Sequence, residues 1–223
     1  MNLYFDIETI PDQTDGALQS HLDSIAAPVR YKKPESIQKW LDNEGPAAAV
    51  EEWKKTALEG ISGSIVSIAW AFDNFPVQGN LDIYCEGVVL QTFFDAVYDK
   101  QKIGEGEHQS ITWIGHNLID FDLRFLYQRA CVLGIKPAFL LPTEARHGST
   151  VYDTMKAWAG WRGYVKQDAL YKALGGQPYE NDDMDGSQVW DYINAGRYDE
   201  VLEYNKRDVK KLRFIYKKLT WNE

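Results

Sequence analysis

The chain has 223 residues, of which 44% are hydrophobic and 13% aromatic, and its formal net charge at neutral pH is −9. This composition supports a full hydrophobic core and excludes an intrinsically disordered chain. The acidic balance argues against a general nucleic-acid binder with a basic surface. It is compatible with an enzyme whose acids hold metal ions, because the ions supply the positive charge that phosphates meet.

The two cysteines, Cys85 and Cys131, do not form a CxxC pattern, so neither a zinc motif nor a disulfide framework is predicted. No apolar run approaches the ~18 residues that a membrane-spanning helix needs. An acidic strand begins where a secretory signal peptide would lie. We therefore expect a soluble, cytoplasmic protein in a reducing environment, with no membrane partner.

In chain order, the first predicted element is a strand at about residues 2–7, which ends before Pro11 because proline cannot donate to a strand ladder. Residues 12–62 lack strand-like alternation, and the stretches 36–43 and 46–58 are typical of helices. The sequence therefore predicts a helical insertion after the first strand.

The remainder of the chain begins with strands and ends with helices. Further strands are predicted at 64–72, 81–85, 111–114 and 150–152. A turn is expected at Gly79-Asn80 and a loop at 104–106. Helices are predicted at 88–101, 120–133, 153–159, 167–174, 187–194 and 198–218. This order predicts an α/β fold with a mixed five-stranded sheet flanked by helices, antiparallel on one side and parallel on the other.

Two carboxylates, Asp6 and Glu8, stand at the end of the first strand. Side chains of a strand alternate between its faces, so these two point the same way. Two acids on one face repel each other unless a cation lies between them, and a divalent ion with oxygen ligands fits. The alternative is a solvated strand end that carries acids by chance. The apolar neighbours Tyr4, Phe5 and Ile7 favour the metal, because they indicate a buried strand.

Further acids follow later in the chain. Asp122 comes shortly after a buried strand that ends in Gly-His-Asn, in the first turns of the next predicted helix. Tyr204 and Asp208 are four residues apart in a predicted helix and therefore share one face. Taken alone, Tyr204 could simply cover the core, and Asp208 could be an exposed acid paired with Lys211 or Arg207.

Three stretches together resemble the exonuclease motifs of the DEDD superfamily. They are Phe5-Asp6-Ile7-Glu8-Thr9, then Asn117 with Phe121-Asp122, then Tyr204 with Asp208. The Tyr-x-x-x-Asp form of the third is similar to the DEDDy branch, and in particular to the proofreading 3′–5′ exonuclease domains of family B DNA polymerases. The resemblance covers about residues 2–218. It implies an RNase H-like fold and a single exonuclease domain over residues 1–223.

The resemblance also implies a site. Two Mg²⁺ or Mn²⁺ ions would be held by four carboxylates, those of Asp6, Glu8, Asp122 and Asp208. Asp6 would bridge both ions, Glu8 and Asp208 would complete one, and Asp122 would reach the other, partly through water. Tyr204 would orient the attacking water, since a phenol with a pKa of ~10 is a poor base at neutral pH. Substrate contacts are implied for Thr9, Ile10, Asn117 and Phe121.

Two features depart from the common form of the family, namely the long insertion at 12–62 and a second acid, Asp120, beside Asp122. The metal role goes to Asp122 because it follows Phe121 as the motif requires, and Asp120 is expected to be a solvated neighbour. Four further residues near these motifs are expected to be structural: His116, Asp153, Trp158 and Trp161. For the two tryptophans, the alternative is stacking on a base of the substrate.

These expectations describe a metal-dependent 3′–5′ exonuclease that releases 5′-mononucleotides from 3′ ends, with single-stranded DNA favoured by the resemblance. The alternatives are an RNA 3′-exonuclease, a non-catalytic module that binds strand ends in a replication complex, and a metal-dependent nucleotide phosphohydrolase. The presence of all four carboxylates counts against the non-catalytic module. The acidic net charge predicts weak binding of long duplexes, or a replication or repair protein that supplies a basic channel.

Overall fold

The computed structural model describes most of the chain, in the stretches 1–104, 107–144, 146–180 and 183–222. The chain divides into two compact units, the first formed by Met1–Glu8 with Ile65–Glu223 and the second by Thr9–Ser64. The bounds of the second unit lie within a few residues of the predicted insertion. A single domain over the whole chain stays a prediction.

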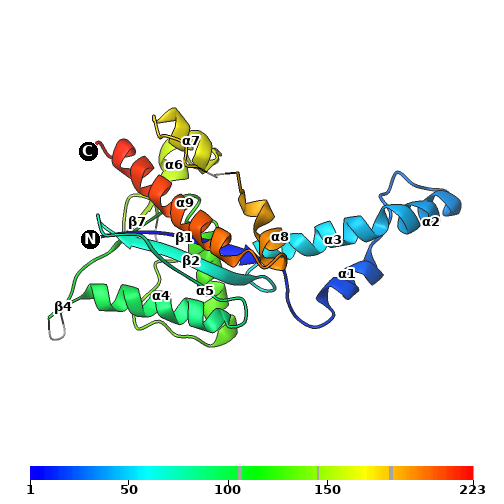
Figure 1. The fold of residues 1–223 in the computed structure, drawn as a ribbon, viewed down its shortest axis with the longest axis horizontal. Helices are drawn as coiled ribbons and strands as arrows, with labels where there is room; N and C mark the ends of the chain where they lie inside the picture. Colours follow the sequence, from blue (N-terminus) through cyan, green and yellow to red (C-terminus); the bar gives the residue numbers. More distant parts are fainter. Residues whose placement is uncertain (105–106, 145, 181–182, 223) are drawn as a thin grey trace. The chain divides into compact units, whose positions relative to one another are not determined.

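The first unit is built on a five-stranded sheet with the order β3-β2-β1-β6-β7 (Figure 1). The strands are β1 (Asn2–Ile10), β2 (Ser64–Phe72), β3 (Gln78–Leu81), β6 (Thr112–Gly115) and β7 (Val151–Asp153). β1, β6 and β7 are parallel, and β3 is antiparallel to β2. Asp73, just after β2, donates its N–H to the carbonyl of Asn2 at the start of β1, so these strands also run in opposite directions. The predicted mixed sheet is therefore confirmed.

Helices cover both faces of this sheet. They are α4 (Glu86–Gln101), α5 (Asp122–Leu133), α6 (Thr154–Ala159), α7 (Gln167–Ala173), the 3-10 helix η2 (Gly186–Gln188), α8 (Val189–Asn194) and α9 (Tyr198–Leu219). Figure 1 shows α9 across one face and α4 and α5 on the other. In the part of the chain that the structure describes, no helix has the length and apolar character to cross a membrane.

Alternation along β1 divides the core into two layers. The layer with α4 and α5 receives three side chains of β1, those of Leu3, Phe5 and Ile7. Tyr4 faces the other way and belongs to a cluster with Val209 and Leu212 of α9. The even-numbered Asp6 and Glu8 therefore lie on the α9 face of the strand, because strand side chains repeat every second residue.

The third strand corrects the sequence-based prediction. It lies at Gln78–Leu81 rather than at 81–85, so Gly79-Asn80 is part of the strand and not a turn. The chain turns directly afterwards, where the Asp82 carboxylate accepts hydrogen bonds from the N–H groups of residues 84–85. An aspartate that bonds the backbone just ahead of it favours a turn over a strand ladder.

A small hairpin was not predicted. β4 (Lys102–Gly104) pairs antiparallel with β5 (Glu107–His108). Gly104 of the predicted loop at 104–106 ends β4, and residues 105 and 106 lie outside the described residues.

The second unit is helical, with α1 (Ala17–Ser24), α2 (Pro34–Asn43), α3 (Gly45–Lys55) and the 3-10 helix η1 (Thr56–Leu58). α1 and α2 each pack against α3. Trp53 of α3 is 6% exposed, and its indole N–H donates to the carbonyl of Asp12 at 2.9 Å. α1 was not predicted from the sequence; it is short, and none of its residues is fully buried.

Candidate active site

Three of the predicted acids converge from opposite ends of the chain. One carboxylate oxygen each of Asp6, Glu8 and Asp208 lies within 4.8 Å of the others. Asp6 and Glu8 come from the α9 face of β1, and Asp208 comes from α9 itself. Glu8 is 6% exposed and the Asp208 side chain 14% exposed, so this group is largely removed from water.

Burial and mutual repulsion disfavour the charged forms of these acids. Burial, with the neighbouring carboxylates, raises the pKa of Asp6 and Glu8 well above the usual range. Burial raises the pKa of Asp208 to about 6, although the ammonium of Lys211 opposes the shift. A divalent cation among the oxygens would offset the repulsion. A donor set made only of carboxylates fits the hard cations Mg²⁺ and Mn²⁺.

Asp122 lies beside this group rather than inside it. It is the first residue of α5, it is 3% exposed, and its Oδ1 accepts the N–H of Ile7 at 3.3 Å. Burial raises its pKa to about 7. Its charge also raises the pKa of Asp6 and of Glu8. The fold therefore brings the fourth predicted carboxylate against the backbone that lies between Asp6 and Glu8.

Tyr204 precedes Asp208 by one turn of α9 and is 8% exposed. Its hydroxyl is hydrogen-bonded to the Asp208 carboxylate. Burial, followed by the charges of Glu8, Asp208 and Asp6, raises the pKa of Tyr204 far above its usual value. This phenol stays protonated at neutral pH, so it can donate a hydrogen bond but cannot act as a base.

Asn205 is a site residue that the sequence analysis missed. It is fully buried, its Nδ2 donates to Asp6 Oδ2 at 2.7 Å, and its Oδ1 accepts the hydroxyl of Ser67 at 2.8 Å. Asp6 is thus held in place by two consecutive hydrogen bonds, from Ser67 of β2 to Asn205 of α9 and from Asn205 to Asp6. The available signal was an amide residue on the apolar face of a helix, next to a motif tyrosine.

Lys211 of α9 holds the Asp208 carboxylate in position. The pairing of Asp208 with Lys211 does form, at 3.1 Å, but it is not an exposed pair, because the lysine side chain is only 1% exposed. The same ammonium donates to Asp168 at 2.7 Å. A buried cation needs such compensation, and two carboxylates supply it.

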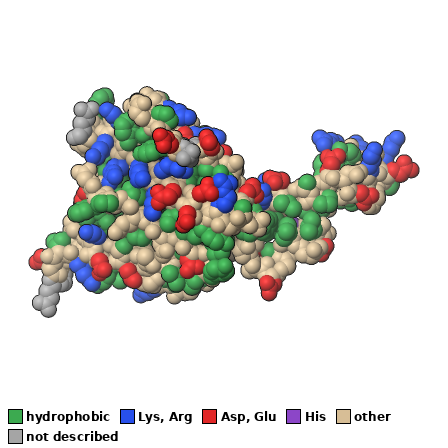
Figure 2. Space-filling view, in the orientation of Figure 1, with side chains coloured by type: hydrophobic (Ala, Val, Ile, Leu, Met, Phe, Trp, Pro, Cys, Tyr) green, Lys and Arg blue, Asp and Glu red, His purple; other side chains and the backbone are tan. Residues whose placement is uncertain are grey.

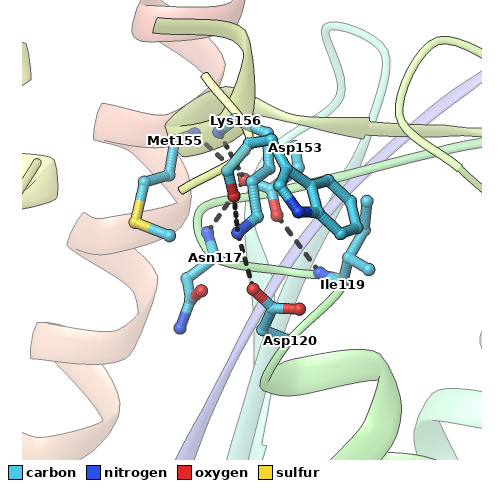
Figure 3. Close-up of polar contacts among 7 residues, drawn as sticks. Asn117, Ile119, Asp120, Asp153, Met155 and Lys156 are labelled. Atoms are coloured by element: carbon cyan, nitrogen blue, oxygen red, sulfur yellow. Dashed lines mark hydrogen bonds and ion pairs between the residues drawn. The ribbon is translucent and has the colours of Figure 1, made fainter. Parts of the chain in front are cut away.

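Asp153 organises the loop that leads to Asp122 (Figure 3). The residue is fully buried at the end of β7. Its carboxylate accepts hydrogen bonds from four backbone N–H groups, those of Asn117, Ile119, Met155 and Lys156. It therefore caps α6 and fixes the loop before α5, which is the structural role expected for it. The loop includes Asn117 at a φ of 62°, a left-handed conformation that asparagine tolerates.

His116 also has a structural role, as expected, because both ring nitrogens have protein partners. Nε2 donates to the carbonyl of Val165 at 2.8 Å, and Nδ1 lies 2.9 Å from the hydroxyl of Thr154. Asp120 is exposed, as expected for a solvated acid, and it also makes an ion pair. Its Oδ2 lies 2.6 Å from the ammonium of Lys156, which joins α6 to the loop before α5.

The four predicted substrate contacts are spread over both units. Thr9 and Ile10 end β1 and belong to the second unit, where the Thr9 hydroxyl donates to the carbonyl of Ala57 at 2.7 Å. The Phe121 ring lies 5.5 Å from that of Phe125. The side-chain amide of Asn117 has no hydrogen bond within the described stretches. Substrate contact by these four residues stays a prediction.

The prediction that Trp158 and Trp161 pack into the protein is wrong. They are 52% and 75% exposed, respectively. α6 ends at Ala159, and a turn directly after it carries the second indole into solvent.

A family model described as "Predicted 3'-5' exonuclease related to the exonuclease domain of PolB" matches residues 85–222, more than half of the chain. The chain belongs to this family. The matched segment includes Asp122, Tyr204 and Asp208. It begins after Asp6 and Glu8, so the convergence of these two acids with the family segment is a finding of the fold alone.

The solved structures agree with the family on the fold. The family B DNA polymerase from the hyperthermophilic archaeon Pyrobaculum calidifontis is similar to 98% of this chain, with a TM-score of 0.60 and 16% sequence identity. The chain spans 24% of that polymerase. At this identity the likeness shows the fold, and it confirms the predicted RNase H-like α/β architecture. A search of the curated proteins found no match.

The raised pKa values predict how stability changes with pH. The pKa of Asp208 is about 6 in the folded state, against ~3.9 for an unperturbed aspartate. Its contribution to stability is therefore present below about pH 4 and is lost as the pH rises through about 6. In thermal unfolding without divalent ions, the parent Tm should fall more between pH 5 and pH 8 than the Tm of Asp208→Asn.

Millimolar Mg²⁺ should restore the Tm of the parent at pH 8 by several degrees and that of Asp208→Asn by less, because a bound ligand stabilises the folded state. Asp199→Asn, which removes an exposed acid of the same helix, serves as the control and should follow the parent. Identical pH and Mg²⁺ responses for the parent and Asp208→Asn would contradict this assignment.

We expect truncation of the Asp153 side chain to cause a large loss of stability. Asp153→Ala leaves four backbone N–H groups without their acceptor and should lower the free energy of unfolding by about 3 kcal/mol or more. The control is Asp185→Ala at an exposed cap, where the carboxylate accepts the N–H of Ser187, and it should cost about 1 kcal/mol. Chemical denaturation measures both, and equal losses would argue against the structural role of Asp153.

Proposed function

We propose that this chain is a metal-dependent 3′–5′ exonuclease that removes nucleotides one at a time from the 3′ ends of single-stranded DNA. The observation that carries the proposal is the meeting of Asp6, Glu8 and Asp208 within 4.8 Å, with Asp122 and Tyr204 beside them. An acidic group alone could hold a cation for many purposes. Its occurrence in a member of a predicted exonuclease family favours phosphodiester hydrolysis.

Two Mg²⁺ or Mn²⁺ ions are the proposed cofactors. Asp6, Glu8 and Asp208 would hold one, and Asp6 with Asp122 would hold the other. The buried, carboxylate-only donor set supports this choice of cation. When bound, such ions supply hydroxide at neutral pH and neutralise charge on the leaving oxygen.

The side chains of the chain itself orient the reactants. The protonated Tyr204 hydroxyl, held by Asp208, would orient the attacking water. Asn205 bonds Oδ2 of Asp6 and leaves Oδ1 of that carboxylate for a cation. Lys211 fixes the Asp208 carboxylate in the same way from the other side. These contacts hold the acids in position before a substrate arrives, which reduces reorganisation during the reaction.

In the proposed reaction, the oxygen of the water attacks the phosphorus of the last phosphodiester. The bond from that phosphorus to the 3′ oxygen of the preceding nucleotide breaks. The products are a 5′-mononucleotide and a strand with a new 3′ hydroxyl. Because the net charge of the chain is −9, a replication or repair protein that supplies a basic channel is part of this proposal.

The central test follows a 5′-labelled single-stranded DNA oligomer. The parent should shorten it stepwise from the 3′ end with Mg²⁺ or Mn²⁺ and leave it intact with EDTA. Asp208→Asn should be slower by about a thousandfold, since the loss of a metal ligand costs several kcal/mol of transition-state stabilisation. Asp199→Asn is the control and should match the parent.

The same assay separates the alternatives. A matched RNA oligomer tests the sugar preference, and a dinucleoside triphosphate tests nucleotide phosphohydrolase activity. The proposal fails if the parent leaves the DNA oligomer intact with both ions, or if Asp208→Asn is as fast as the parent.

Tyr204→Phe tests the orienting role of the hydroxyl. It should lower kcat by about 10- to 100-fold, while the Mg²⁺-induced rise in Tm stays close to that of the parent, because no carboxylate is lost. Tyr198→Phe, at the first residue of α9, is the matched control. An unchanged kcat for Tyr204→Phe would remove this residue from the proposed mechanism.

A further inference from the structure

We infer that the segment 156–167 forms a stacking platform for single-stranded nucleic acid, with Trp161, Arg162 and Tyr164 as the contacting side chains. The inference rests on the proposed exonuclease function and concerns the nucleotides that precede the reacting 3′ end. Trp158 adds a further exposed ring at the end of α6.

A tight turn presents these side chains. α6 ends at Ala159, and Gly160 follows with a φ of 78°, in the left-handed region. At Gly163, an added Cβ would lie 2.0 Å from the carbonyl oxygen of Ala159, so no residue larger than glycine fits without a shift of the backbone. The chain therefore folds back within a few residues and places Trp161 and Arg162 at the tip of the turn.

The segment is anchored on both sides to the elements that carry the site acids. Near its start, the ammonium of Lys156 bonds the Asp120 carboxylate at 2.6 Å and the Trp161 carbonyl at 3.2 Å. Figure 3 shows Lys156 and Asp120 next to the loop that leads into α5. At its end, the side-chain amide of Gln167 donates to the backbone carbonyl of Asp208 at 2.8 Å. The segment thus connects the α5 side of the site with the α9 side.

The exposure and chemistry of the segment fit a nucleic-acid strand. Trp161 is 75% exposed and Tyr164 is 72% exposed, and aromatic rings of this kind stack on bases of any sequence. Arg162 is exposed and makes no ion pair within the described residues, so its guanidinium is available to a phosphate. Figure 2 shows hydrophobic side chains next to Lys and Arg side chains on the surface over α6, α7 and α9.

The attachment of the segment to both sides of the proposed site favours a nucleic acid over a protein partner. Trp, Tyr and Arg are also enriched at protein interfaces, so residue type alone does not separate the two kinds of partner. Along the chain, a guanidinium lies between two exposed rings. Bases alternating with phosphates match that order. An enzyme that removes one nucleotide at a time must also hold the remainder of the strand, and a platform joined to both sides of the site can do so.

The test compares Trp161→Ala with the parent on oligothymidylates of two and twelve nucleotides. For the 12-mer, KM should rise about tenfold, which corresponds to the loss of one base–ring stack. The rise should be much smaller for the dinucleotide, which has only one nucleotide before the one that is removed. Trp161→Phe should keep most of the affinity, because a smaller ring still stacks. Trp221→Ala is the control, since Trp221 is 91% exposed and follows the far end of α9.

Equal KM values of Trp161→Ala and the parent for the 12-mer would overturn the platform and leave the patch to a protein partner. An equal loss on both substrates would also overturn it, because it would indicate a distorted site. If the parent hydrolyses neither substrate, the proposed function fails, and binding of the labelled 12-mer in EDTA decides the platform separately. Binding about tenfold weaker in Trp161→Ala would then support it, and equal binding would overturn it.

Discussion

Buried carboxylates held within 4.8 Å of one another are the constraint on which the first unit depends. Such a group is unfavourable by itself, because both burial and like charge favour the neutral acids. The fold compensates with fixed donors, Asn205 on Asp6 and Lys211 on Asp208. These donors leave part of the repulsion in place, because burial and the neighbouring carboxylates still raise the pKa of Asp6 and Glu8. A divalent cation among the oxygens would offset the remaining repulsion.

Helix α9 carries most of this arrangement. Its buried stripe, which includes Val201, Val209, Leu212 and Ile215, places the helix against the sheet and its flanking helices by apolar packing. The polar residues of the site lie on the same buried face of α9, so the apolar packing of the helix also fixes their positions. Four residues of this one helix form part of the site or hold its acids in position, namely Tyr204, Asn205, Asp208 and Lys211. The Asp153 carboxylate fixes the loop before α5 by accepting two of its backbone N–H groups, and it accepts two more from the start of α6.

Net charge is a poor guide to how this chain would meet a nucleic acid. The overall charge of −9 includes the acids that form the candidate metal site. Bound cations would reverse the local sign of the charge there. Beyond the site, the proposed platform has exposed rings and an exposed guanidinium, which would hold a strand by stacking and by one phosphate contact. Local chemistry at the strand end therefore matters more than the sum of charges.

The sequence alone determined the features that follow from local periodicity. The two-residue repeat of a strand put Asp6 and Glu8 on one face, and the helical repeat put Tyr204 with Asp208. The sequence also offered Lys211 as a partner of Asp208, three residues away in the same helix. Only the tertiary structure decided that Asn205 binds Asp6, that Lys211 also binds Asp168, and that both donors are buried, because these partners come from other elements. The exposure of Trp161 was likewise decided by the turn after α6 and by the anchors of the segment on the loop before α5 and on α9. Periodicity depends on neighbours in sequence, whereas pairing and exposure depend on which elements the folded core brings together.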